Sequence, residues 1–392
     1  MNISASKRVQ SIGAYAFAEV DRRVAVLREK GINPIDFGVG DPTNPTPSLI
    51  IKALHEGAIK RATAGYPSYA GAPEYRRAAA AWFERRFGVK LDPDAEICAT
   101  IGSKEAVFNF HEGFIDPGDC VIIPSPGYPP YTRGTLFAEG KPCHIPLLEK
   151  NGFLPDLDAI PKDVLAKARL MWFNYPNSPT GRIAPPEFFK RVVEFGQKHE
   201  IIIASDEAYT EIYFTEKPRS ILEYARDGVV AFHSLSKRSA MTCYRVGFAA
   251  GDRRIIEIFK KVKMNIDSGA ATFIQDAAMA AFSDEKHVDE MRAEYRVKRD
   301  IMVEAFRAVG LPDCAPEATI YIWQKCPQGV SSVDFAKALL APEIAVVTTP
   351  GAWLGDKMPD GSNPGEGYVR LALVPTIEET KKAAERIRRM KF

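Results

Sequence analysis

A lysine and two arginines stand in the stretch SLSKRSAMTCYRVGF, which begins at Ser234, shortly after the apolar run VVAF, and leads into the apolar run VGFAA. The amine of Lys237 is a nucleophile that can form a Schiff base with a carbonyl compound. Arg245 can bind an anion together with the hydroxyls of Ser234 and Ser236. A solvated charge run would explain Lys237 and its neighbour Arg238, but not the apolar sequence on both sides. The stretch therefore predicts a binding site at the end of a buried strand.

A carboxylate occupies a similar place in the run IIIASDEAY, where Asp206 and Glu207 directly follow apolar residues and Tyr209 comes next. A carboxylate at the exit of a buried strand is costly unless a positive group neutralises it. A structural salt bridge would meet that need, and so would a bound cation. Asp206 is therefore a candidate partner for a positively charged ligand.

Three further turns follow apolar runs. In GSKEAVFNF, Gly102 and Ser103 open a helix whose free N–H groups suit a phosphate, although an ordinary N-cap has the same sequence. In SPGYPPY, Tyr128 offers a rigid aromatic face, and in NYPNSPTG, Asn177 lies in a tight turn. Taken singly, such a tyrosine is more often packed and such an asparagine more often structural.

The elements that carry these groups are seven short apolar runs that alternate with amphipathic helical patterns. Runs this continuous indicate strands covered on both faces, and the alternation is typical of a mostly parallel α/β sheet. In such a sheet ligands bind beyond the carboxyl ends of the strands, which is where the polar groups stand. The runs are EICATIG, CVIIPSP, CHIPL, RLMWFNYP, IIIASDEAY, VVAFHSLS and VGFAAG.

One ligand accounts for these side chains together: a phosphorylated aromatic aldehyde with a protonated ring nitrogen. Lys237 can bond to the aldehyde, Asp206 can hold the ring proton, and Arg245 can bind the phosphate with a serine and the helix N-terminus. We therefore expect pyridoxal 5'-phosphate as the cofactor. No metal is expected, because the six cysteines form no CxxC pair and no histidine spacing that suits zinc.

The C-terminal part has a different pattern. Apolar residues at helical spacing predict one long helix at about 283–310, followed by the strand-like runs EATIYIWQK, IAVVTTPG and GYVRLALV. We expect a large cofactor-binding domain at 46–280. Residues 1–45 together with 281–392 would form a smaller α+β domain.

Size and charge exclude several classes of protein. The chain has 392 residues, with 46% hydrophobic and 26% charged residues, which are ordinary values for a globular enzyme. Its net charge of +2 gives no field suited to nucleic acid, which is not an expected partner. It contains neither a membrane-spanning run nor a secretory signal, so a cytoplasmic protein without a membrane partner is expected.

The motifs NYPNSPTG, SDEAY, SLSK with Arg245 eight residues after the lysine, and GYVRLALV resemble, in order, the class I/II aminotransferases of fold type I. The resemblance covers nearly the whole chain and implies a homodimer with a seven-stranded sheet. It gives Lys237, Asp206 and Tyr209 catalytic roles. Arg370 would bind the substrate carboxylate, with the backbone near Gly40. The implied cofactor-binding residues are Ser103, Lys104, Tyr128, Asn177, Asp206, Tyr209, Ser234, Ser236, Lys237, Arg245 and, from a second subunit, Tyr66.

Within this family the chain is most similar to the diaminopimelate aminotransferases of lysine biosynthesis, as the stretches SIGAYAFAEVDRR, FGVGDPTNPTP and GEGYVRLALV illustrate. Tyr15 and Lys104 would then lie on the substrate side, with Asn177. SDEAY follows the general family wording, and KRSAMTCYR begins like the N-succinyldiaminopimelate enzymes. The expected substrates are an amino acid and a 2-oxo acid such as 2-oxoglutarate. The amino acid could be diaminopimelate, its N-succinyl form, or an amino acid of the aspartate or aromatic type.

Other functions on this fold stay open. Carbon–sulfur lyases, acyl-condensing enzymes and decarboxylases use the same fold and cofactor, so the reaction type rests on the resemblance. A transcription regulator of this fold would need an N-terminal DNA-binding module, and only about forty residues precede the family-like region. A nicotinamide-binding protein would need GxGxxG after an early strand, which the chain lacks.

Overall fold

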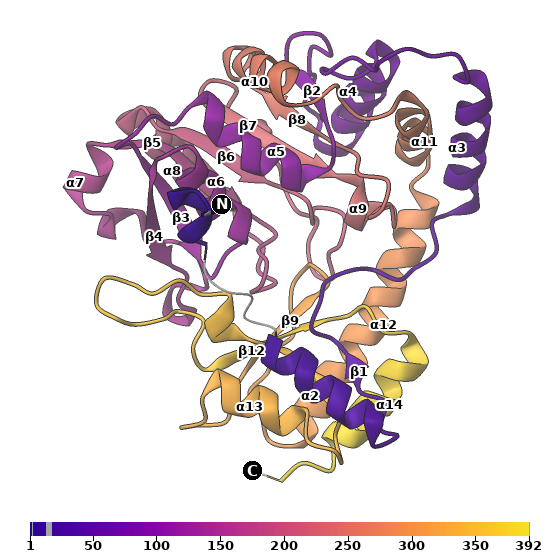
Figure 1. Cartoon of the computed structure of the whole chain (residues 1–392), viewed down its shortest axis with the longest axis vertical. Coiled ribbons are helices and arrows are strands. Elements are labelled where there is room, and N and C mark those ends of the chain that lie inside the picture. Colours follow the sequence, from indigo (N-terminus) through magenta and orange to yellow (C-terminus); the bar gives the residue numbers. More distant parts are fainter. Residues whose placement is uncertain (2, 13–17, 392) are drawn as a thin grey trace.

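The seven apolar runs form the strands of one sheet in the order β2-β8-β7-β6-β5-β3-β4 (Figure 1). Every neighbouring pair is parallel except those of β8, which runs antiparallel to β2 and β7. The predicted α/β class with a mostly parallel seven-stranded sheet is therefore confirmed. The strands are β2 (Ile97–Thr100), β3 (Cys120–Ser125), β4 (Lys141–Pro146), β5 (Ala168–Asn174), β6 (Ile202–Asp206), β7 (Val229–Ser234) and β8 (Gly247–Gly251).

Helices cover both faces of this sheet, which explains why its central strands are buried and mostly apolar, whereas the edge strand β4 is only partly buried. One face carries a core that includes Trp82, Phe189 and Phe282 from α4, α8 and α11. The other carries Tyr131 and Phe259 from α6 and α10. The helices around the sheet are α3 (Ser48–Lys60), α4 (Pro73–Phe87), α5 (Ser103–Asn109), α6 (Pro129–Phe137), α7 (Lys162–Leu165), α8 (Pro186–His199), α9 (Leu235–Arg238), α10 (Arg253–Ile266) and α11 (Thr272–Ser283).

A second body, in the lower half of Figure 1, is built on the antiparallel sheet β11-β12-β9. Its core joins Phe306, Leu371 and Ile387 to Phe37 from the N-terminal part. The pairing of β1 with β10 also ties the N-terminal part to this body. Its remaining elements are β1 (Ile35–Asp36), β9 (Tyr321–Lys325), β10 (Val346–Val347), β11 (Thr349–Pro350), β12 (Tyr368–Ala372), α2 (Ala18–Glu29), α13 (Ser332–Leu339) and α14 (Ile377–Ile387). Helix α1 (Lys7–Gln10) lies instead against the first body, where Arg8 Nη1 donates to the carbonyl of Phe137 at 3.3 Å (Figure 1).

Helix α12 (Lys286–Ala308) runs from the first body into the second (Figure 1). It lies inside the stretch predicted as one long helix, and its apolar face is buried as the spacing indicates. The computed structural model describes residues 1, 3–12 and 18–391. No helix within those ranges is both long and apolar enough to span a membrane. The division into residues 46–280 and residues 1–45 with 281–392 stays a prediction.

Candidate active site

A cavity of about 440 Å³ lies at the carboxyl ends of β5, β6 and β7, where the second body meets the sheet. Most of the side chains predicted from the sequence line it, although they are spread over more than three hundred positions. Those residues are Gly40, Ser103, Lys104, Tyr128, Asp206, Tyr209, Ser234, Ser236, Lys237, Arg245 and Arg370. Within the described part of the chain, no group of His, Cys, Asp and Glu side chains is arranged to hold a metal ion.

Asp206 ends β6 and is 5% exposed. Burial raises the pKa of its carboxyl group to about 6, because a charged carboxylate loses its hydration there. Two hydrogen bonds oppose this effect: the hydroxyl of Tyr131 donates to Oδ2 at 2.8 Å, and the N–H of Ala208 donates to Oδ1 at 3.3 Å. The carboxylate is thus held in place but is not neutralised by these contacts.

Lys237 lies on the one-turn helix α9, directly after β7, and projects into the cavity. Its Nζ donates a hydrogen bond to the carbonyl oxygen of Gly40 at 2.5 Å. Burial lowers the pKa of its amine, because the ammonium form is desolvated. A larger fraction of this amine is therefore neutral and nucleophilic than in an exposed lysine.

Another part of the cavity lining can accept an anion. Ser103 opens α5, and its buried Oγ has no hydrogen-bond partner in the described structure. Gly102, with φ of 74°, brings the backbone against Arg245, since a Cβ there would lie 2.3 Å from Nη2. Arg245 itself has φ of 54°, a sparsely populated conformation for a non-glycine residue, and its Nη1 donates to Ser236 Oγ at 3.4 Å. A strained arginine beside an unpartnered hydroxyl is the chemistry that a phosphate requires.

Arg370 reaches the cavity from β12 of the second body. Its Nη2 donates to the carbonyl of Gly38 at 2.9 Å, while its buried Nε has no hydrogen-bond partner in the described structure. The guanidinium lies 4.5 Å from the ring centroid of Tyr321, whose hydroxyl accepts from Tyr209 at 3.3 Å. A Cβ at Gly40 would lie 2.0 Å from that hydroxyl, so only glycine leaves room for it. The guanidinium of Arg370 is therefore fixed in place, and some of its N–H groups remain available to bind a carboxylate.

Asn177, predicted to donate to the cofactor ring hydroxyl and to contact substrate, does not line the cavity. Its fully buried amide donates to the carbonyl of Asn174 and accepts from the hydroxyl of Thr180 at 2.7 Å, which closes the turn. Asn174 and Ser178 line the cavity instead. The amide of Asn177 is thus used by its own turn, and its contact with the cofactor or substrate stays a prediction.

Two other predicted residues lie elsewhere. Tyr66 does not line the cavity and is 94% exposed, so its arrival from a second subunit stays a prediction. Tyr15 lies outside the described residues. Lys104 lies at the rim of the cavity and is exposed.

Sequence reasoning missed Tyr131 and Tyr321. Tyr131 lies in the stretch SPGYPPY, but its fully buried ring stacks on Trp172 with centroids 4.6 Å apart, and only this packing aims its hydroxyl at Asp206. Tyr321 begins strand β9, which was expected only to build the smaller sheet. The alternation of residues along EATIYIWQK could have shown on which side of the strand Tyr321 lies. It could not have shown that this side borders the cavity.

Comparison with known proteins gives consistent matches. The model of the family described as Aminotransferase class I and II matches residues 32–387. A protein of Aquifex aeolicus named LL-diaminopimelate aminotransferase is 44% identical over 99% of both chains. A solved structure of a probable N-succinyldiaminopimelate aminotransferase from Thermus thermophilus has a TM-score of 0.87 and 32% identity, covering 95% of this chain and 99% of its own. A single mutant of Thermus thermophilus aspartate aminotransferase has a TM-score of 0.90 and 28% identity, covering 99% and 100%.

Replacing Tyr131 by Phe should raise the pKa of Asp206 further, by about one unit, because a hydrogen bond to the charged carboxylate is lost. The folded protein binds the Asp206 proton more tightly than the unfolded chain does. The unfolding free energy of the cofactor-free protein therefore falls as pH rises from the ordinary value of 3.8 through the folded value of about 6. In the variant this fall should continue to higher pH, as urea unfolding across pH 4.5–8 would measure.

The matched control is Tyr175→Phe. Tyr175 is as buried as Tyr131, but its hydroxyl donates to the carbonyl of Phe153 at 2.6 Å. That variant should lose stability equally at every pH. An identical pH dependence for the two variants would contradict the assignment of Tyr131 to Asp206.

Proposed function

Since the chain belongs to the aminotransferase class I and II family, as its motifs predicted, we propose that it transfers an amino group from a diaminopimelate-type amino acid to a 2-oxo acid such as 2-oxoglutarate, in lysine biosynthesis. The observation that carries the site is the convergence of Lys237, Asp206, Arg245 and Arg370 on one cavity. The chain is an aminotransferase, and enzymes of this family depend on pyridoxal phosphate.

The residues present fit that cofactor. The buried Oγ of Ser103 has no partner, and the guanidinium of Arg245 stands beside it where Gly102 leaves space, as a phosphate needs. The buried carboxylate of Asp206 requires a positive group, as a protonated ring nitrogen would be. We therefore assign the phosphate end to Ser103, Lys104, Ser234, Ser236 and Arg245.

When bound, pyridoxal phosphate supplies an aldehyde that exchanges amines and a ring that withdraws electrons from the substrate Cα. Asp206 would keep a proton on the ring nitrogen, because ion pairing there would recover the cost of burying its carboxylate. Tyr128 offers an aromatic face to the ring, and Tyr209 a hydroxyl. Lys237 would hold the cofactor through its amine. The same amine would be placed to take the proton from the substrate Cα, a role that its lowered pKa favours.

Substrate is bound by its carboxylates. Arg370 presents a planar guanidinium that stays charged and can bind an α-carboxylate by a two-point contact. Lys104, exposed at the rim, is placed to meet a second charged end of a long substrate, as Tyr15 was also predicted to do. The identity of 44% with the Aquifex aeolicus protein, against 32% and 28% for the two solved structures, favours LL-diaminopimelate over its N-succinyl form and aspartate.

We also propose a cytoplasmic homodimer in which Tyr66 enters the partner's cavity. Several large apolar side chains are exposed on α3, on the loop that carries Tyr66, and on the ends of α10 and α11 that face them, which a second copy would cover. They are Ile59, Tyr66, Tyr69, Met264 and Phe273, with exposures between 37% and 94%.

Replacing Lys237 by Ala should abolish the covalent attachment of the cofactor and lower kcat by at least about a thousandfold, because both the anchor and the base for Cα are lost. Borohydride treatment followed by peptide mass mapping would find the cofactor on Lys237 in the wild type. Lys104→Ala, at the rim, should keep the attachment. A cofactor fixed to another lysine in the wild type would contradict the assigned site.

A donor screen tests the substrate. With 2-oxoglutarate as acceptor, kcat/KM for LL-diaminopimelate should exceed that for N-succinyl-LL-diaminopimelate, aspartate and phenylalanine by at least about tenfold, since only the first presents a second charged amino-acid end to the rim. A preference for aspartate would refute the substrate but keep the transaminase. Release of ammonia and pyruvate from cysteine conjugates, without glutamate formation, would indicate a lyase.

A further inference from the structure

Helix α9, which carries Lys237, is too short to hold its own shape. It has four residues, one turn, and a single turn of helix is unstable without tertiary contacts. At its start, the Oγ of Ser234 accepts from the N–H of Ser236 at 3.2 Å. The position of Lys237 must therefore be set by what holds the other end of the turn.

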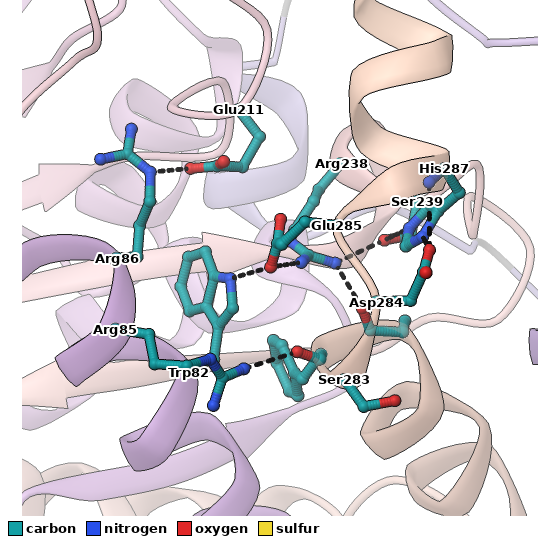
Figure 2. Close-up of polar contacts among 12 residues, drawn as sticks. Trp82, Arg85, Arg86, Glu211, Arg238, Ser239, Ser283, Asp284, Glu285 and His287 are labelled. Atoms are coloured by element: carbon teal, nitrogen blue, oxygen red, sulfur yellow. Dashed lines mark hydrogen bonds and ion pairs between the residues drawn. The ribbon is translucent and has the colours of Figure 1, made fainter.

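Arg238 holds that end. Its side chain is 3% exposed, and its Nη1 donates to the carbonyl of Ala281 at 2.8 Å and to Ser239 Oγ at 2.9 Å (Figure 2). Its Nη2 donates to Glu285 Oε1 at 2.5 Å. The guanidinium also lies 5.3 Å from the ring centroid of Trp82. The residue next to Lys237 is thus fixed to the end of α11 and to the residue before α12.

Glu285 connects this arginine to two helices. Its Oε1 also accepts from Trp82 Nε1 of α4 at 3.1 Å, and it directly precedes the first residue of α12. A second contact runs in parallel, since Ser239 Oγ lies 2.9 Å from Nε2 of His287 in the first turn of α12 (Figure 2). The end of α9 is therefore tied to α4, α11 and the helix that joins the two bodies.

We propose that Arg238, through its ion pair with Glu285, is a positioning residue that fixes Lys237 for proton transfer at the substrate Cα. A buried guanidinium that loses a partner becomes an uncompensated charge, so α9 must shift to rehydrate it. Since Lys237 is the adjacent residue, its Nζ shifts with the turn. A displacement of about 1 Å at a reacting group costs about a hundredfold in rate, without a matching loss in substrate binding.

The alternative is an ion pair that only stabilises the fold, and the chain offers a matched control for it. Arg86 is 7% exposed and donates from Nε to Glu211 at 2.7 Å (Figure 2). Its Nη2 donates to the carbonyls of Thr210 and Pro218. Its guanidinium also lies over an aromatic ring, that of Phe87 at 4.4 Å. The two arginines match in burial and bonding, whereas their partners differ: Glu285 is 48% exposed and Glu211 is 6% exposed. Within the described residues the Arg86 pair makes no hydrogen bond to α9, and Glu211 acts on Arg238 only through its charge.

The experiment compares Arg238→Lys and Arg86→Lys in the holoenzyme. Lysine keeps the charge but cannot make the forked contacts. Arg238→Lys should lower kcat about 10- to 100-fold and leave KM for the amino donor within about twofold, while Arg86→Lys leaves both near the wild-type values. A brief borohydride pulse followed by peptide mapping should also fix less cofactor on Lys237 in Arg238→Lys only. Urea unfolding should show similar losses of stability for both.

If Arg238→Lys does not fold, Glu285→Gln replaces it, because that side chain is 48% exposed and the change is mild. Equal kcat and equal borohydride fixation in the Arg238 or Glu285 variant and the Arg86 control would overturn the positioning role. The inference rests on the proposed role of Lys237. Mapping the wild type separates the two failures: cofactor on another lysine refutes the proposed function, whereas cofactor on Lys237 with unchanged variants refutes only the role of Arg238.

Discussion

The buried carboxylate of Asp206 is the constraint on which the site depends. It ends a strand whose neighbours are apolar, it is 5% exposed, and its pKa is raised to about 6 by burial. A hydroxyl from Tyr131 and one backbone N–H hold it, and no ion pair joins it to a lysine or arginine of the described chain. Burying a charge in this way destabilises a fold unless a cation is bound there. The position is therefore best explained by a positive ligand.

The sheet brings other polar groups next to the buried carboxylate of Asp206. Asn174 and Asp206 are paired residues at the ends of β5 and β6, and Ser234 ends β7 beside them. Parallel strands place their carboxyl ends at the same edge of the sheet. Residues at that edge can therefore bind a phosphate, a ring nitrogen and an amine of one ligand. The second body adds what the sheet lacks, namely the fork of Arg370 and the backbone of Gly40, which accepts from Lys237.

Much of this arrangement follows from the sequence. Continuous apolar runs indicated all seven strands, and the polar groups after them indicated the edge at which a ligand binds. Side-chain direction inside turns did not follow, because NYPNSPTG does not reveal that Asn177 closes its own turn while Ser178 faces the cavity. The sequence assigned Arg238 no role in the site, whereas the structure shows it buried and paired with Glu285, which is distant in the sequence. Contacts of this kind depend on tertiary packing, which local patterns do not encode.

The most direct test of the central claim is the protonation state of the cofactor ring. Pyridoxal phosphate isotope-labelled at its ring nitrogen would be bound to the wild type and to Asp206→Asn, and the nitrogen chemical shift recorded at pH 8. A protonated nitrogen in the wild type and an unprotonated one in the variant are the result that a buried carboxylate partner predicts. An unprotonated nitrogen in the wild type, or the same shift in both proteins, would contradict the account.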